Sequence, residues 1–378
     1  EAGQCASTRY FGAEGEPVIS KEYHCAGYDY GYDDWGNTTG NTYIGLDGKP
    51  MVRRDLGYAS VQSEYDSMGN EIAAAYFDAD GKPTVGKKGG YASVEKTFDK
   101  GRMTEARYYD TEGNLTLRQD RGYAIVKCWQ DKRGQNTSEF YYGADRKPII
   151  SKELLCAGKK FKHDEAGNVS EVTFLGIDGE KIIHRDWGYA QAKYKNDVAG
   201  NIIEASYFDT KGKPIIQNEG YAFYKKTELD RNLIEYRYLD TEGELILRKD
   251  NGCALIKKTY DDYGQLIGES YYGVDEEPVI STNYHCAGRK WKYDEQGNRT
   301  DTISIGLDGH PMNRTDTGYA RIHSKYNDWG QEVFVSYLNA EGKPAIAKDY
   351  GYSSCKNTYD ENGYCIQSCY YDTEKHLI

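Results

Sequence analysis

The sequence predicts an all-β protein: a tandem repeat array of antiparallel β-hairpins, wound as a spiral or solenoid-like rod, with about three short strands per 32-residue unit. Three observations lead to this class. A phrase close to Gly-Tyr-Ala recurs along the 378 residues, alternating apolar and polar residues follow it, and two kinds of Asp-Gly turn separate the alternating runs. Repetition at periods of about 20 to 50 residues is typical of arrays in which each unit buries its apolar face against its neighbours.

The glycine of the recurring phrase defines the period. Its copies are 30 to 36 residues apart, and the order of the gaps repeats, so that four units form one larger module. The anchor glycines are Gly27, Gly57, Gly90, Gly122, Gly158, Gly188, Gly220, Gly252, Gly288, Gly318 and Gly351. We therefore predict a single elongated array over residues 1–378, made of a partial module 1–26, the modules 27–157 and 158–287, and a partial module 288–378.

Each unit contains three apolar runs. After Gly188, the residues Ala190, Ala192 and Tyr194 alternate with polar or exposed positions, which is the two-residue period of a half-buried strand. A second run occupies residues 203–207, and a shorter third run follows the Lys-Pro pair within residues 213–216. The pattern predicts two strands and a third, shorter strand in each unit.

Two Asp turns separate these runs. One is Asp-x-x-Gly-Asn, as in residues 66–70, and the other is Asp-x-x-Gly-Lys-Pro, as in residues 78–83. Asp accepts hydrogen bonds from the backbone two residues on, and Gly supplies the positive φ of a tight turn. Because proline lacks a backbone donor, the third run is expected to start at an edge or in a loop. A parallel β-solenoid and a propeller are the alternatives to the wound hairpin array.

Tyrosine dominates the aromatic residues, with 37 copies against 9 of phenylalanine. A Tyr ring packs while its hydroxyl stays near polar partners, and an isolated hairpin is marginal in water, so the rings are expected to hold neighbouring repeats together. The predicted packing residues are Tyr58, Tyr65, Tyr76, Tyr91, Tyr123, Tyr189, Tyr194, Tyr207, Tyr221, Tyr238, Tyr319 and Tyr326.

The composition argues against several classes of function. The net charge is -12, and no basic stripe is present to neutralise phosphates, so no nucleic-acid partner is expected. No run of 18 apolar residues occurs, so no membrane span is predicted in this segment. No Ser/His/Asp group, phosphate-binding glycine loop or acid pair recurs with the module, so we predict neither an enzyme nor a cofactor site.

Cysteine and histidine recur only in part. Cys25, Cys156 and Cys286 fall at one position per module and are interpreted mainly as small buried side chains. His24 and His285 precede two of them, but Leu155 stands there in the middle module, so no metal site is predicted. The candidate disulfide cluster is Cys355, Cys365 and Cys369.

Six Asn-x-Ser/Thr triplets are candidate glycosylation sites. Several of them fall in the predicted turns, where a sugar is tolerated. They begin at Asn37, Asn114, Asn136, Asn168, Asn298 and Asn313.

The segments 65–70, 260–265 and 359–363 resemble the Tyr-Asp-x-x-Gly core of rearrangement-hotspot (YD) repeats of bacterial surface proteins. A weaker resemblance, in aromatic-plus-glycine hairpins, is to choline-binding and clostridial toxin repeats. The Gly-Tyr-Ala phrase and the Gly-Lys-Pro turn are additional to the YD pattern. The resemblance implies a secreted or surface-exposed β-array with a structural, adhesive or glycan-contacting role.

Three functions follow as hypotheses. The first is an extracellular structural protein that forms a stalk, fibre or filament. Neither end of the sequence differs in composition from the rest, which favours end-to-end self-association or continuation in a longer array. The second is a carbohydrate-binding or adhesive repeat, with glycans as partners and exposed aromatic rings, including the five Trp residues, as platforms; the alternative is that these rings form the core between repeats. The third is the scaffold of a larger enzyme or toxin.

Overall fold

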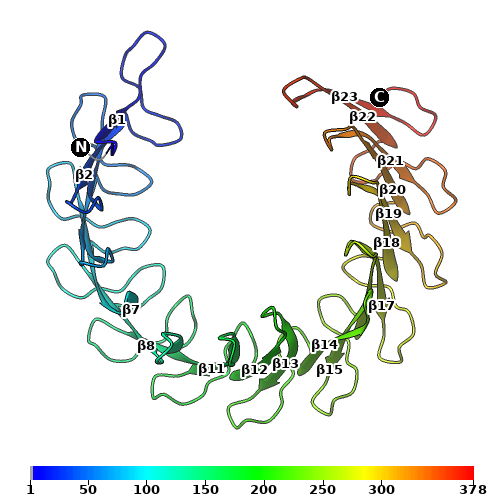
Figure 1. The fold of residues 1–378 in the computed structure, drawn as a ribbon, viewed down its shortest axis with the longest axis horizontal. Coiled ribbons are helices and arrows are strands. Elements are labelled where there is room, and N and C mark those ends of the chain that lie inside the picture. The colour runs from blue at the N-terminus through cyan, green and yellow to red at the C-terminus, as the bar shows by residue number, and fades with distance from the viewer. Residues whose placement is uncertain (1–2) are drawn as a thin grey trace. The chain divides into compact units, whose positions relative to one another are not determined.

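The computed structural model describes residues 3–378, and every regular element in that range is a β-strand, which confirms the all-β class. Contacts divide the chain into two compact units, one ending at Arg185 and the other comprising Asp186–Ile378. The prediction of a single array over 1–378 stays a prediction, because the structure divides into two units of the same construction (Figure 1).

Unit 1 contains eleven strands, and each pairs antiparallel with the next along the chain. They are β1 (Ser7–Arg9), β2 (Gly27–Tyr32), β3 (Thr38–Ile44), β4 (Ser60–Tyr65), β5 (Glu71–Phe77), β6 (Ser93–Asp99), β7 (Arg102–Tyr109), β8 (Ile125–Gln130), β9 (Asn136–Tyr142), β10 (Gly158–His163) and β11 (Val169–Leu175).

Unit 2 contains twelve strands with the same next-neighbour antiparallel pairing. They are β12 (Gln191–Asn196), β13 (Ile202–Phe208), β14 (Phe223–Asp230), β15 (Leu233–Leu239), β16 (Leu255–Tyr260), β17 (Leu266–Tyr272), β18 (Gly288–Tyr293), β19 (Arg299–Ile305), β20 (Arg321–Tyr326), β21 (Glu332–Leu338), β22 (Ser354–Tyr359) and β23 (Cys365–Tyr371).

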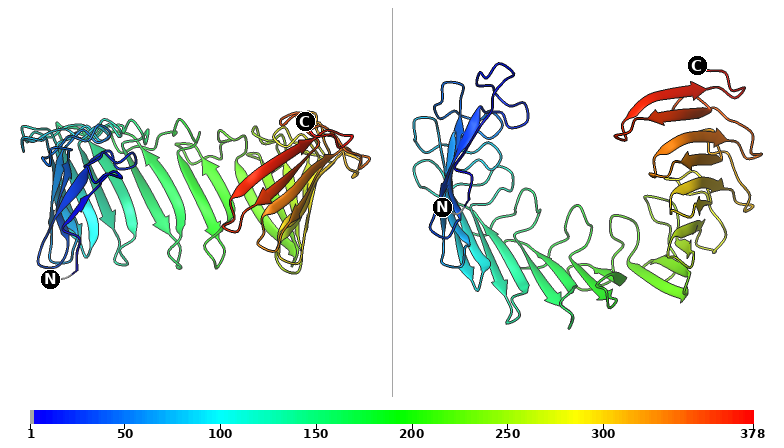
Figure 2. Two further views of the ribbon diagram at one scale, coloured as in Figure 1. Left: turned by 90° about the horizontal axis from the view of Figure 1, so that it is seen from above. Right: turned by 45° about the horizontal axis from the view of Figure 1, so that its top comes forward.

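Each repeat is one hairpin followed by one long loop, and the two connections lie at opposite ends of the strands (Figure 2). The hairpin turn forms as the Asp-x-x-Gly-Asn pattern predicts. In the β4–β5 turn, Oδ1 of Asp66 accepts from the backbone N–H groups of Met68 and Asn70, both at 2.9 Å, and Gly69 has φ of 80°. The Asp therefore stabilises the turn through its own side chain.

The third apolar run forms no strand, which corrects the expectation of about three strands per unit. After the second Asp turn, Pro83 makes an isolated antiparallel bridge to Phe77, and the same bridge recurs in every repeat. Proline stands at this position in eight of the twelve bridges and has no N–H to extend a ladder, whereas the other four carry Leu115, Lys181, Leu245 and Leu377. The chain then closes a turn in which the N–H of Gly90 donates to the carbonyl of Gly86 at 2.8 Å. Each repeat consequently has two strands and a folded loop.

The structure also corrects the register of the repeats. The equivalent of Gly57 is the residue that ends the loop with positive φ, and in three repeats this residue is not glycine. Gly27, Gly158 and Gly288, used above as anchors, lie three residues further on, inside strands β2, β10 and β18. With the positive-φ residues aligned, the spacing is 32 or 33 residues throughout, at His24, Gly57, Gly90, Gly122, Leu155, Gly188, Gly220, Gly252, His285, Gly318 and Gly351.

A few second-turn positions that need positive φ carry a side chain, and one of them gives a simple stability test. Arg146 has φ of 63° where most repeats have glycine, and its side chain is exposed. A non-glycine residue in this region costs about 1–2 kcal/mol, part of which glycine loses again through its larger backbone entropy. We expect Arg146→Gly to raise the free energy of unfolding by about 0.5–1 kcal/mol in urea denaturation. An unchanged or lower value would argue against strain at this position.

The core of each unit is a chain of tyrosine rings on one face of the sheet. Tyrosines of the Gly-Tyr-Ala phrase alternate with tyrosines of the second strand of each hairpin. Successive ring centroids are 4.4–6.1 Å apart, within the range of favourable aromatic pairs. In unit 1 the chain runs through Tyr43, Tyr58, Tyr76, Tyr91, Tyr108, Tyr123 and Tyr141, and in unit 2 through Tyr189, Tyr207, Tyr221 and Tyr238, and again through Tyr319, Tyr337, Tyr352 and Tyr370.

Cysteine takes the tyrosine position of this chain in four repeats. Cys25, Cys156, Cys253 and Cys286 are fully buried there. In two of these repeats a loop tyrosine two residues earlier supplies the ring, since Tyr23 stacks on Tyr10 at 5.6 Å and Tyr284 stacks on Tyr271 at 5.5 Å. The module cysteines are therefore small buried side chains, and beside Cys25 and Cys286 a tyrosine of the loop supplies the ring.

Alternate long loops add a cation to the ring chain. Arg53, Arg118 and Arg248 lie over the rings of Tyr43, Tyr108 and Tyr238 at 4.7, 4.8 and 4.6 Å, and each is paired with the Asp two residues later. Such cation–π contacts are favourable where the cation is partly desolvated. Arg314 and His184 occupy the same position in two further alternate loops, and Arg314 pairs with Asp316. The loops between carry a small or uncharged residue there, namely Ser20, Gly86, Ser151, Gln217, Ser281 and Ala347.

Burial of the rings predicts a loss of structure at high pH. Burial raises the pKa of Tyr207 and Tyr224 to about 12 and also raises the pKa values of Tyr58, Tyr76 and Tyr189. Because these folded-state pKa values exceed the unfolded value of about 10, the stability they reflect is complete below pH 10 and is lost as pH rises through the folded pKa. We expect tyrosinate absorbance and loss of β circular dichroism to appear together; full ionisation near pH 10 with the dichroism intact would contradict this.

Candidate functional site

Three of the hairpin turns carry large aromatic side chains at their outermost position. Trp35, Tyr263 and Trp329 occupy the same place, directly before the turn glycine, and are 80%, 91% and 74% exposed. They are thus unlike the core tyrosines, and they are equivalent solvent-facing rings of the kind that stack on sugars. The other three tryptophans differ, because Trp291 is buried under Arg289, Trp129 lines a groove, and Trp187, which is 51% exposed, lies in a long loop and not in a hairpin turn.

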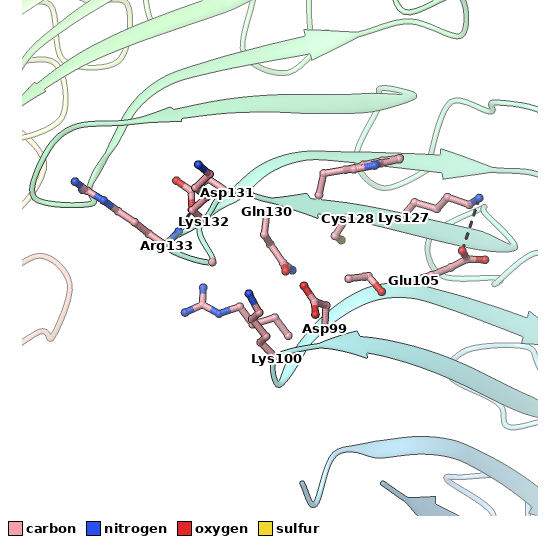
Figure 3. Close-up of a pocket in the computed structure, with 13 residues that line it drawn as sticks. Asp99, Lys100, Glu105, Lys127, Cys128, Gln130, Asp131, Lys132 and Arg133 are labelled. Carbon is pink, nitrogen blue, oxygen red and sulfur yellow. Dashed lines mark hydrogen bonds and ion pairs between the residues drawn. The ribbon is translucent and has the colours of Figure 1, made fainter. Parts of the chain in front are cut away.

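That groove, of about 640 Å³, lies in unit 1 between the turn ends of the β6–β7 and β8–β9 hairpins (Figure 3). Strands β7 and β8 pair only through Glu105–Arg107 and Ile125–Lys127, so the hairpins separate beyond these residues. In five other repeats a strand-end tyrosine lies in the corresponding gap. The hydroxyl of Tyr65, for example, donates to the carbonyl of Thr38, 27 residues earlier, at 3.1 Å.

At the groove, Gln130 replaces the tyrosine. Its Nε2 donates to the carbonyl of Met103, again 27 residues earlier, at 3.1 Å, so the hydrogen bond is kept while the volume of the ring is missing. The turn opposite is also short, because Lys100 and Gly101 form it with φ of 50° and 76° in place of the five-residue Asp turn. The smaller side chain and the shorter turn add to the open space, but a strand-end ring does not close such a gap by itself, because a groove of about 600 Å³ at the corresponding place in unit 2 includes Tyr293 in its lining.

The groove is rich in cations. Its lining includes five cationic and three acidic side chains, in a chain with a net charge of -12. Two of the acids are already engaged: Glu105 pairs with Arg107 at 2.5 Å and Lys127 at 3.7 Å, and Oδ1 of Asp131 accepts two backbone N–H groups of its own turn. Those turn hydrogen bonds lower the pKa of Asp131. The cations are Lys100, Arg102, Lys127, Lys132 and Arg133.

The remaining lining offers a ring and an inert thiol. Trp129 is 45% exposed and is held edge-on against Phe140, with ring centroids 5.7 Å apart. Burial raises the pKa of the neighbouring Cys128 to about 11, which keeps this thiol protonated and unreactive at neutral pH. The groove can therefore bind a ligand through charge, stacking and the Gln130 amide, and it offers no activated nucleophile in Cys128.

The sequence-predicted packing tyrosines fall into two groups. Nine lie in the ring chain, whereas Tyr65, Tyr194 and Tyr326 lie further along the strands. Tyr326 donates its hydroxyl to the carbonyl of Arg299 at 3.2 Å, as Tyr65 does to Thr38, and Tyr194 hydrogen-bonds Tyr189. The Tyr-Asp pair of the YD-like motif thus has two distinct tasks: the Tyr ties one hairpin to the preceding one, and the Asp closes the turn.

The candidate disulfide cluster is not formed in this structure. Cys355, Cys365 and Cys369 are free thiols on β22 and β23. The register pairs Cys355 with Tyr370 and Cys369 with Lys356, so the side chains of these two cysteines point to opposite faces of the hairpin. A bond between Cys355 and Cys369 is excluded by this geometry; a bond through Cys365 stays a prediction.

The six sequon asparagines are all on turns, loops or strand ends, and four of them take part in turn structure. The amide groups of Asn37, Asn114, Asn168 and Asn298 donate to the Asp four residues earlier, at 2.8–3.5 Å. Asn114, Asn136 and Asn313 are exposed. Glycosylation of any of them stays a prediction.

Two features are absent from residues 3–378, a metal-binding cluster and a membrane-crossing helix. No group of three or more His, Cys, Asp or Glu side chains is arranged to hold a metal ion in the part of the chain that the structure describes. Nor does this part contain a helix with the length and apolar character needed to cross a membrane.

The fold and the groove define the class of this chain as an all-β tandem-repeat protein. The sequence matches no protein-family model and no curated protein. Among solved structures it is similar to the Tc holotoxin pore of Photorhabdus luminescens (11% identity, TM-score 0.28) and to the TcdB2–TccC3 complex (11%, 0.27), with 93% of this chain covered in both. It spans 17% and 21% of those chains, so it corresponds to about a fifth of their length.

A porin-like protein of Bacteroides uniformis also shows similarity, at 11% identity and a TM-score of 0.18, over 81% of this chain and 86% of that one. Likenesses this distant assign no activity, substrate or partner to the chain.

Proposed function

We propose that this chain is an extracellular structural repeat segment that serves as a stalk, fibre or filament and has no catalytic role of its own. The observation that carries the proposal is that each repeat is completed by its neighbours within a unit. The ring chain is shared between successive hairpins, and no repeat has a separate core. A chain held together in this way is better suited to holding other groups apart and presenting them than to catalysing a reaction.

The long loops provide a second connection between neighbours. In each case a loop N–H donates to the carbonyl directly before the positive-φ residue of the preceding repeat, at 2.8–3.1 Å. The donor and acceptor pairs are Lys87–Leu56, Gln119–Gly89, Lys152–Arg121, Asn218–Trp187, Lys249–Glu219, Thr282–Asn251 and Lys348–Thr317. Backbone bonds of this kind do not depend on side-chain identity, so they suit an array whose sequence varies between repeats.

The structural role is tested by the dimensions and association of the purified chain. Negative-stain microscopy and sedimentation velocity are expected to give particles with a frictional ratio well above that of a compact sphere, and longer particles at higher concentration if the chains associate end to end. A compact, monodisperse sphere-like particle at all concentrations would contradict the proposal.

The second candidate function is adhesion to glycans, and the exposed turn rings favour it. An exposed aromatic ring offers an apolar face on which a sugar ring can stack. On a glycan array, binding is expected to fall with Trp329→Ala, whereas the buried Tyr337→Phe variant is a matched control for general effects on the fold. If the Trp329→Ala and Trp35→Ala proteins bind every glycan as strongly as the unchanged protein does, this role is contradicted.

A further inference from the structure

The groove between the β6–β7 and β8–β9 hairpins differs in charge from the groove of similar volume that Tyr293 lines in unit 2, because five cationic side chains line the first and none lines the second. A strand-end tyrosine lies in the corresponding gap at Tyr32, Tyr65, Tyr293, Tyr326 and Tyr359, where its hydroxyl donates to a backbone carbonyl 27 residues earlier at 2.9–3.2 Å. Gln130 keeps that bond without the ring. The two hairpins are therefore tied together at the groove, and an amide takes the place of a phenol ring.

We propose that this groove binds an acidic saccharide, one that carries carboxylate or sulfate groups. A volume of about 640 Å³ is in the range of small-ligand sites and suits one or two sugar rings. The half-exposed indole of Trp129 offers an apolar platform for a sugar face, and the Gln130 amide is a hydrogen-bonding group for hydroxyls.

The charges of the groove select for an anion. Lys100, Arg102 and Lys132 are exposed on the two facing turns, and Arg133 donates to the carbonyl of Glu165 at 2.9 Å, a contact that holds its guanidinium group at the turn. Figure 3 shows Lys100 on one hairpin and Lys132 and Arg133 on the other, with Gln130 between them. Ammonium and guanidinium groups form charge-assisted hydrogen bonds with carboxylate and sulfate oxygens.

Nucleic acid is a poorer occupant. A long polyphosphate needs a basic track well beyond one groove, and the chain as a whole is strongly acidic. A short acidic sugar needs only the local cations. The inference is independent of the structural role proposed above, and it deepens the glycan candidate at residues separate from the exposed turn rings.

The test is calorimetric titration of the full chain with an oligogalacturonate and with a heparin oligosaccharide, using maltohexaose as the neutral control. We expect at least one anionic probe to bind and its affinity to fall as salt is added. Binding of the oligogalacturonate alone would identify carboxylate as the group recognised, and binding of the heparin fragment alone would identify sulfate. Equal binding of the neutral sugar, or binding of neither anionic probe, would overturn the proposal.

Gln130→Tyr adds the ring found in other repeats and removes the amide from the groove. It is expected to weaken binding of the anionic probe at least about tenfold while the melting temperature stays the same or rises. Unchanged affinity in a folded Gln130→Tyr protein would contradict the part assigned to the Gln130 amide.

Two further variants guard against an effect on folding. The double change Arg102→Ala with Lys132→Ala removes exposed charges only and is expected to weaken binding to a similar extent; retained affinity would count against the proposal. Arg231→Ala, at the other short hairpin turn, is the matched control and is expected to bind normally. Loss of glycan binding by Trp329→Ala but not by Gln130→Tyr would support the turn rings and reject the groove.

Discussion

Replacing Tyr271 by alanine is expected to lower the free energy of unfolding by about 3–5 kcal/mol, the range for removing a buried aromatic ring. This ring is 0% exposed, stacks on Tyr284, and its hydroxyl donates to Glu269 at 2.9 Å. The change leaves a cavity and removes the partner of a carboxylate that is itself buried. Urea denaturation followed by circular dichroism measures the loss, with the fluorescence of buried Trp291 as a probe in the same unit.

Two controls separate the ring from its hydroxyl. Tyr271→Phe keeps the stack and removes the bonds to Glu269 and to Arg289, which donates to the hydroxyl at 3.1 Å, so a smaller loss of about 1–2 kcal/mol is expected. Tyr263→Ala removes a ring that is 91% exposed and should change stability by less than about 0.5 kcal/mol. Equal losses for Tyr271→Ala and Tyr263→Ala would mean that the ring chain does not hold the repeats together.

Gly122→Ala is expected to destabilise unit 1 by about 2 kcal/mol or more, because two costs combine. Gly122 has φ of 73°, which strains any side chain, and an added Cβ would lie 2.8 Å from Cβ of Lys152 and 3.0 Å from its backbone nitrogen. That nitrogen donates to the carbonyl of Arg121, so the clash falls on the bond that joins the two loops.

The matched control for this change is Gly113→Ala in the same unit. Gly113 has φ of 82°, but nothing lies within 4 Å of its added Cβ, so only the backbone strain of about 1 kcal/mol is expected. The difference between the two variants in thermal and urea denaturation measures the close approach of neighbouring loops. If both variants lose the same stability, the loop contact contributes nothing.

The repeat and the hairpins could be predicted from the sequence because their signals are local. Asp66 and Gly69 define a turn whose side-chain and backbone bonds lie within five residues. The alternation of Ala and Tyr after Gly188 likewise gave the correct strands. Each repeat has two strands and a loop instead of three strands, because the third apolar run forms only one isolated bridge to the second strand.

The register and the groove could not be predicted because they depend on the backbone and on neighbours. A Cys-Ala-Gly phrase resembles Gly-Tyr-Ala, and only the positive φ of Leu155 identifies it, with His24 and His285, as the equivalent of Gly57. To predict the groove, one would need to know that in five repeats a strand-end tyrosine donates its hydroxyl to a carbonyl 27 residues earlier. One sequence signal was available: Gln130 precedes Asp131 where Tyr65 precedes Asp66.

The alternation of arginine-bearing and uncharged loops limits how such a gene can grow. Arg53 and Arg118 are separated by a loop that carries Gly86 at the same position, so neighbouring guanidinium groups do not meet. Duplicating one arginine-bearing repeat would place two partly buried guanidinium groups, each paired with its own Asp, in neighbouring loops. Adding or deleting repeats in pairs keeps the alternation, whereas an odd number of repeats breaks it.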